Sequence, residues 1–125
     1  VLTFKAKDPT SGQEYFFLPG GKVEEDETAP EAAERETFEE TGFQVQVEPS
    51  LNTDREYIFH WNGEDYNCLT IFYWAKLKSA LQSEVRDATY NLGVHWIPLA
   101  EVSSVFGYHP DILSAIQEIL EKKNG

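Results

Sequence analysis

The chain has 125 residues, 41% of them hydrophobic and 14% aromatic, so we expect one globular domain spanning residues 1–125 and no disordered chain. Its formal net charge of −12 argues against duplex nucleic acid as a partner, because that needs a basic surface. With one cysteine and no apolar run near the roughly 20 residues of a membrane span, we expect no intrachain disulfide, no membrane partner and a cytoplasmic location.

The first elements are predicted to be two strands joined as a hairpin. Residues 1–7 and 14–18 have the composition of strands, and the turn-forming run DPTSG at 8–12 separates them. The hairpin leads into Gly20 and Gly21, where the lack of a side chain lets a backbone carbonyl approach a metal ion or phosphate closely.

The next element is predicted to be a helix from about Ala29 to Thr41. Thr28 and Glu31 form the T-x-x-E pattern of a capping box, and Gly42 stands where a left-handed C-cap belongs. The helix boundaries can therefore be placed from local sequence alone.

Three glutamates of this helix are spaced to share one face. Glu36, Glu39 and Glu40 stand at i, i+3 and i+4, where like charges repel one another. A solvated acidic face is the usual explanation for such a cluster taken alone, and a bound cation that offsets the repulsion is the alternative. Such hard oxygen ligands favour Mg²⁺ or Mn²⁺.

The middle of the chain is predicted to hold a short strand and a long hairpin. Residues 43–47 alternate as a half-buried strand that Pro49 ends, and Asn62-Gly63 is a strong hairpin turn between strands within 55–77. The second arm, 66–77, is almost continuously apolar, so we expect it at the sheet centre, buried on both faces, with Cys68 as a buried inert thiol.

The last third is predicted to contain a loop, a short strand and a helix. Residues 79–92 have weak periodicity, residues 94–97 read as a strand, and a turn or short helix follows. The final helix starts near Pro110 and carries one apolar stripe: Ile112, Leu113, Ile116, Ile119 and Leu120. Two helices around a mixed β-sheet predict an α/β protein built as a three-layer α/β/α sandwich.

Residues 21–43 resemble the Nudix box, G-x5-E-x7-R-E-U-x-E-E-x-G-U with U apolar. Only Thr37 departs from this pattern, since it stands where the family usually has Leu, Val or Ile. The sandwich fold agrees with the resemblance, which also implies one further strand before residue 1. The matching residues are Gly21, Glu27, Arg35, Glu36, Glu39, Glu40, Gly42 and Phe43.

The resemblance implies a divalent-metal-dependent hydrolase that cleaves the pyrophosphate bond of a nucleoside diphosphate linked to another moiety. A nucleoside triphosphate or a dinucleoside polyphosphate would be the small-nucleotide substrate, and Mg²⁺ or Mn²⁺ the cofactor. The resemblance implies catalytic roles for Glu36, Glu39 and Arg35, metal ligation by Glu36, Glu39, Glu40 and the Gly20 carbonyl, and substrate-side positions for Lys22, Glu27 and Tyr57.

The general base is less well defined by the pattern. Family members often use an acid of the box or one shortly before a tryptophan like Trp96, but residues 90–96 contain no carboxylate. We therefore place Glu39 first, with Glu84 and Asp87 as alternatives. The missing acid also leaves open a non-catalytic Nudix-like domain that senses a nucleotide or binds a partner. Tyr57 is equally well a base-stacking or a structural ring, and both a monomer and a homodimer fit the sequence.

Overall fold

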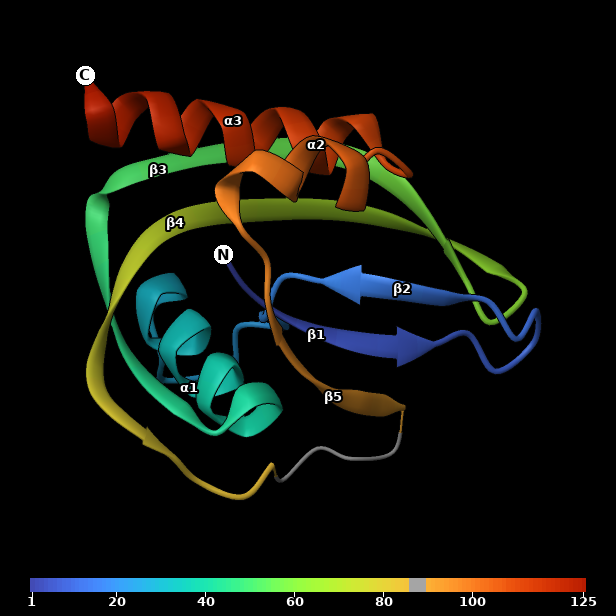
Figure 1. Cartoon of the computed structure of the whole chain (residues 1–125), viewed down its shortest axis with the longest axis horizontal. Helices are drawn as coiled ribbons and strands as arrows, with labels where there is room; N and C mark the ends of the chain where they lie inside the picture. Colours follow the sequence, from blue (N-terminus) through green and yellow to red (C-terminus); the bar gives the residue numbers. More distant parts are fainter. Residues whose placement is uncertain (86–89) are drawn as a thin grey trace.

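The computed structural model describes residues 1–85 and 90–125 (Figure 1). In chain order the elements are β1 (Leu2–Lys7), β2 (Glu14–Phe17), α1 (Ala29–Thr41), β3 (Phe43–Trp61), β4 (Glu64–Gln82), β5 (Asn91–Trp96), the 3-10 turn η1 (Leu99–Glu101), α2 (Val102–Val105) and α3 (Pro110–Asn124). No helix in these two ranges is both long and apolar enough to cross a membrane.

The strands lie between helices. β1 pairs with β2 and with β5, while β3 pairs with β4, and all of these described pairs are antiparallel. Figure 1 shows α3 along one side of the β3–β4 ribbon and α1 on the other. The predicted α/β sandwich is therefore confirmed, with the described strands arranged in two antiparallel sheets where we expected one mixed sheet.

Both predicted hairpins are confirmed. β1 and β2 pair from Phe4 opposite Phe17 to Lys7 opposite Glu14. At the tip of the second hairpin Asn62 and Gly63 have φ angles of 52° and 78°. Two successive positive φ values are those of the two-residue turn that matches the twist of the flanking strands.

The predicted bounds and caps of α1 are also confirmed. The Glu31 backbone N–H donates to the Thr28 hydroxyl at 3.2 Å, and the Thr28 N–H donates to the Glu31 carboxylate at 2.9 Å. Gly42 closes the helix with a φ of 78°. Since these signals are all local, the sequence was sufficient to place this helix.

The predicted strand end at Pro49 is wrong. β3 continues from Phe43 to Trp61, and its pairing with β4 shifts register between Glu48 and Asn52. Such an irregularity accommodates a proline, which has no N–H to give to the sheet. β4 likewise runs to Gln82, which pairs with Phe43 at the start of β3, and β5 begins at Asn91. The predicted loop is therefore wrong for residues 79–82 and 91–92, and the predicted strand at 94–97 starts three residues earlier and ends at Trp96.

The predicted burial of β4 on both faces is wrong as well. Its described pairing is with β3 alone, and Leu69 is 74% exposed. A continuous apolar run indicates a strand but does not say how many neighbours it has. Cys68 is half-buried where we expected it buried, and burial raises the pKa of its thiol, which agrees with an inert side chain.

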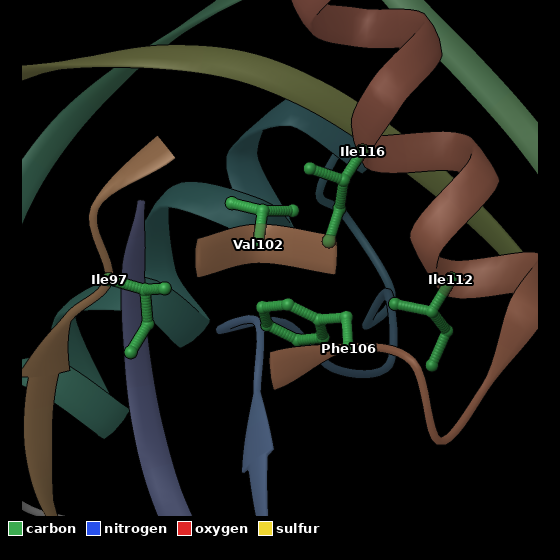
Figure 2. Close-up of a cluster of buried hydrophobic side chains, with 5 residues drawn as sticks. All are labelled: Ile97, Val102, Phe106, Ile112 and Ile116. Atoms are coloured by element: carbon green, nitrogen blue, oxygen red, sulfur yellow. The ribbon is translucent and has the colours of Figure 1, made fainter. Parts of the chain in front are cut away.

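The main described core lies where α2 and α3 meet the chain after β5 (Figure 2). Phe106 is fully buried and points into a cluster with Val102, Ile112 and Ile116. On α3 the positions 112, 116 and 119 are buried, and 113 and 120 pack partly buried against the cluster, so the predicted stripe is confirmed. The predicted turn or short helix after β5 appears as η1 and α2.

Asp8 joins the two hairpins. This buried carboxylate accepts the N–H groups of Thr10 and Ser11 at 2.8 and 3.3 Å and that of Asn62 at 3.2 Å. We expect Asp8→Ala to lower the melting temperature by about 5 to 10 °C, because three backbone donors lose their acceptor. Thermal unfolding followed by circular dichroism measures this, with the exposed Asp65→Ala as control. Equal melting temperatures of the two variants would contradict the role of Asp8.

Candidate functional site

The glycine turn after β2 lies directly against the acidic face of α1. The Gly20 backbone N–H donates to Glu40 Oε1 at 2.7 Å. A Cβ on Gly21 would lie 2.6 Å from the carboxyl carbon of Glu36, closer than real side chains approach. Two of the three predicted glutamates are therefore packed against this backbone, and a side chain at residue 21 would displace the Glu36 carboxylate.

Arg35 gathers the carboxylates of the site. Its Nε and Nη2 form a bidentate pair with Glu27 at 3.1 and 2.8 Å. Its Nη1 donates to Glu36 at 2.7 Å and to Glu39 at 3.2 Å, while Nη2 also donates to the Lys22 carbonyl at 3.0 Å. One guanidinium thus connects the loop to two of the predicted metal ligands.

These contacts shift the pKa values of Glu27 and Arg35. Hydrogen bonds from Arg35 and from the Glu24 backbone N–H hold the pKa of the Glu27 carboxyl below its usual value. Glu27 and Glu36 raise the pKa of the Arg35 guanidinium further above its already high range. Both side chains therefore stay charged at neutral pH.

The lowered pKa of Glu27 predicts a loss of stability in acid. A depressed carboxyl pKa contributes stability that is complete above its ordinary value of roughly 4.3 and is lost as the pH falls through the folded value. We expect the melting temperature of the wild type to fall more steeply between about pH 5 and pH 3 than that of Glu27→Gln. Glu25→Gln, in the same loop, is the control and should follow the wild type. Parallel curves for wild type and Glu27→Gln would exclude this linkage.

The carboxylate oxygens of this site suit a hard divalent cation, although they are not arranged as a closed metal site. Within residues 1–85 and 90–125 no group of three or more acidic, histidine or cysteine side chains has metal-site geometry. Glu36 and Glu39 instead each accept a hydrogen bond from Arg35 through one carboxylate oxygen. Their second oxygens accept no hydrogen bond from the described residues, so the pair keeps the carboxylate oxygens that Mg²⁺ or Mn²⁺ prefers.

The two remaining candidates for the general base differ in position. Glu84 lines an open pocket of about 500 Å³ together with Phe38. Phe38 follows Glu36 by two residues, about 200° around the helix, so the two side chains leave opposite sides of α1. Asp87 lies outside the described residues.

Tyr57 is set among core side chains. Its hydroxyl is 3.0 Å from the Thr70 hydroxyl, and its ring packs edge-on against His109 with centroids 4.8 Å apart. Burial raises the pKa of the Tyr57 phenol. These contacts fit the structural interpretation of this ring that the sequence left open.

Two features of the site escaped the sequence analysis. The Asn91 side-chain nitrogen donates to the Glu40 carbonyl at 2.8 Å and ties the start of β5 to α1. Thr37, the departure from the box, is buried and donates its hydroxyl to the Ala33 carbonyl at 2.7 Å. The first contact spans 51 residues and has no local signal, whereas the second could be expected from the ordinary behaviour of threonine in helices.

Comparison with known proteins agrees with this geometry. The family model described as NUDIX domain matches residues 1–118. A solved structure described as a NUDIX hydrolase from Nitrosomonas europaea is similar over 97% of this chain and 80% of its own, with a TM-score of 0.66 and 21% sequence identity. No curated protein matches significantly.

Proposed function

Because the chain belongs to the NUDIX domain family and is a pyrophosphohydrolase, we propose that it cleaves small nucleotides in a reaction that depends on Mg²⁺ or Mn²⁺. The substrate class is a nucleoside triphosphate or a dinucleoside polyphosphate. Water attacks one phosphorus of the diphosphate, and the bond from that phosphorus to the bridging oxygen breaks.

One observation supports this proposal above the others, namely the packing of the glutamate face against the glycine turn. The 2.7 Å hydrogen bond from the Gly20 N–H to Glu40, and the Glu36 carboxylate beside Gly21, bring two carboxylates against the backbone of this turn. Phosphoryl transfer needs positioning and charge stabilisation more than covalent help, and such a cluster can provide both.

We assign metal binding to Glu36, Glu39, Glu40 and the Gly20 carbonyl. When bound, a divalent cation neutralises negative charge on the diphosphate and lowers the pKa of a coordinated water. Arg35 holds one oxygen of Glu36 and one of Glu39 in place and leaves the other oxygen of each carboxylate without a hydrogen bond from Arg35. Arg35 is therefore a positioning residue in this proposal.

Glu39 is our first choice for the general base. Its side chain is 35% exposed, and the oxygen that does not contact Arg35 is open to accept a proton from water. Glu84 is less well suited, since it lines the pocket beside Phe38. Asp87 stays an alternative prediction.

The substrate-side assignments of Lys22, Glu27 and Tyr57 stay predictions. Lys22 is in the exposed loop that Arg35 fixes through the Lys22 carbonyl, so its ammonium can reach a phosphate. Glu27 braces that loop through the bidentate pair with Arg35. Tyr57 is the weakest of the three, because its half-buried ring and its hydroxyl both have protein partners. The cytoplasmic location and the choice between monomer and homodimer are also predictions.

Phosphate release from a panel of nucleoside triphosphates and dinucleoside polyphosphates tests the proposal. We expect hydrolysis of at least one of them with Mg²⁺ or Mn²⁺ and a loss of that activity in EDTA. Nucleotide binding without hydrolysis under any metal condition would favour the nucleotide-sensing alternative instead.

A further inference from the structure

A group of aromatic side chains from β2, β3 and the residue before β5 has no part in the reaction described above. Phe17 on β2, Phe59 and Trp61 on β3, and Tyr90 just before β5 are in ring contact. The Trp61 centroid is 5.4 Å from that of Phe17 and 6.4 Å from that of Tyr90, both edge to face, and Phe17 is 5.7 Å from Phe59. We call these four residues the aromatic wall.

Two connections fix the aromatic wall next to Glu40. Phe17 precedes Gly20 by three residues, hence by at most about 10 Å of chain, and the Gly20 N–H donates to the Glu40 carboxylate. Tyr90 precedes Asn91, whose side chain donates to the Glu40 carbonyl. Phe17 and Tyr90 therefore each lie within three residues of a backbone or side-chain contact with Glu40.

Within the wall Tyr90 is the exposed ring, and Trp61 is the half-buried ring in contact with it. Tyr90 is 49% exposed and Trp61 is half-buried, with Phe17 and Phe59 packed behind the indole. Tyr57 differs, because its hydroxyl and its ring are engaged by Thr70 and His109. The exposed part of the wall is thus held by aromatic neighbours while its ring surface stays accessible.

We propose that Trp61 and Tyr90 bind the nucleobase of the substrate, an assignment that rests on the nucleotide hydrolysis proposed above. The wall is made of uncharged rings, so it does not attract phosphates, whereas every base has a π-face that stacks on aromatic side chains. A base on this surface keeps the diphosphate of the same nucleotide beside Glu40. The aromatic wall therefore contributes affinity for the nucleoside and little discrimination among the four bases.

Binding of two probes in the presence of Mg²⁺ tests this assignment by calorimetry. One probe is the set of adenosine, guanosine, cytidine and uridine 5′-(α,β-methylene)diphosphates, and the other is methylenediphosphonate, which has no base. We expect Trp61→Leu and Tyr90→Leu each to weaken binding of the nucleotide that the wild type binds most tightly. The expected loss of affinity is roughly 5- to 150-fold, the range measured for single base–aromatic stacks. Both variants should bind methylenediphosphonate as the wild type does.

Trp96→Leu is the matched control. Trp96 is 52% exposed and lies at the opposite end of β5 from Asn91, roughly 16 Å along the strand. It should bind both probes like the wild type. Trp61→Phe and Tyr90→Phe keep a ring and should recover most of the nucleotide affinity, which a general loss of folding would not allow.

The results of these binding experiments test the base site and the proposed hydrolysis independently. Unchanged nucleotide affinity in both leucine variants, or equal weakening of both probes, overturns the role of the wall. A wild type that binds methylenediphosphonate as tightly as every nucleotide also overturns it, while leaving the hydrolysis proposal intact. A wild type that binds neither probe overturns the proposed function and the base site with it.

Discussion

Glu40→Gln should lower turnover of a nucleotide substrate with Mg²⁺ by at least roughly a hundredfold while the protein stays folded. Glu40 is buried on the side facing the glycine turn, and a glutamine can still accept the Gly20 N–H through its amide oxygen. The substitution therefore removes a negative charge and keeps the shape of the turn. Steady-state kinetics over a range of Mg²⁺ concentrations measures the effect.

Thermal unfolding gives a second measurement on the same variant that does not depend on turnover. Without metal, the substitution relieves repulsion among three neighbouring like charges but weakens the charge-assisted hydrogen bond from Gly20, so Glu40→Gln should melt close to the wild-type temperature. With Mg²⁺ the wild type should gain stability, because a ligand that binds only the folded state stabilises it, and the variant should gain less.

Glu34→Gln is the matched control for Glu40→Gln. Glu34 is on the same helix and its Oε2 also accepts a backbone N–H, that of Val47, at 2.9 Å. Among the described residues its side chain forms no hydrogen bond or ion pair with Arg35, and we expect wild-type turnover. Wild-type turnover in Glu40→Gln, or an equal loss in both variants, would show that the charge of Glu40 has no special part in the reaction.

Features of the fold are predicted correctly from the sequence where the residues that determine them are close together in the chain. The bounds of α1 depend on Thr28, Glu31 and Gly42, which are all adjacent to or within the helix, and they were predicted correctly. The same holds for the turn at Asn62-Gly63. Local conformational preferences decide these features, so the sequence alone contains the answer.

The parts that could not be predicted depend on partners far apart in the chain. The continuation of β3 beyond Pro49 follows from pairing with β4, and the exposure of Leu69 follows from which neighbours β4 has. Apolar composition does not encode either fact.

The candidate site likewise has some features that are visible in the sequence and others that only the fold brings about. The spacing of Glu36, Glu39 and Glu40 is visible in the sequence, as is the resemblance that assigns Arg35 a role in holding them. The contact of Asn91 with Glu40 and the meeting of Phe17 with Trp61 join elements that only the folded chain brings together. The sequence thus shows the acidic residues of the candidate site, whereas the ring contacts of the aromatic wall depend on the fold.

Gly21→Ala is the second change with a large expected effect. The added methyl group would lie 2.6 to 2.9 Å from the carboxyl atoms of Glu36, so the carboxylate must move away from the turn. A displacement of about 1 Å at a reacting centre can lower turnover roughly a hundredfold, and we expect a loss of that order. Turnover with Mg²⁺ and the melting temperature should be measured together, since the exposed turn should leave the fold intact.

Gly20→Ala separates the steric effect of Gly21→Ala from any general intolerance of the turn. A Cβ at residue 20 meets nothing within 4 Å, and alanine keeps both the N–H that Glu40 accepts and the carbonyl that we assign to the metal. This variant should lose far less activity than Gly21→Ala. Restoration of activity in Gly21→Ala by Glu36→Asp, whose carboxylate is one methylene farther from the turn, would identify the clash itself as the cause. Equal losses in the two alanine variants would instead mean that the turn needs glycine at both positions for its backbone conformation, and the packing of Glu36 against residue 21 would then have no separate role.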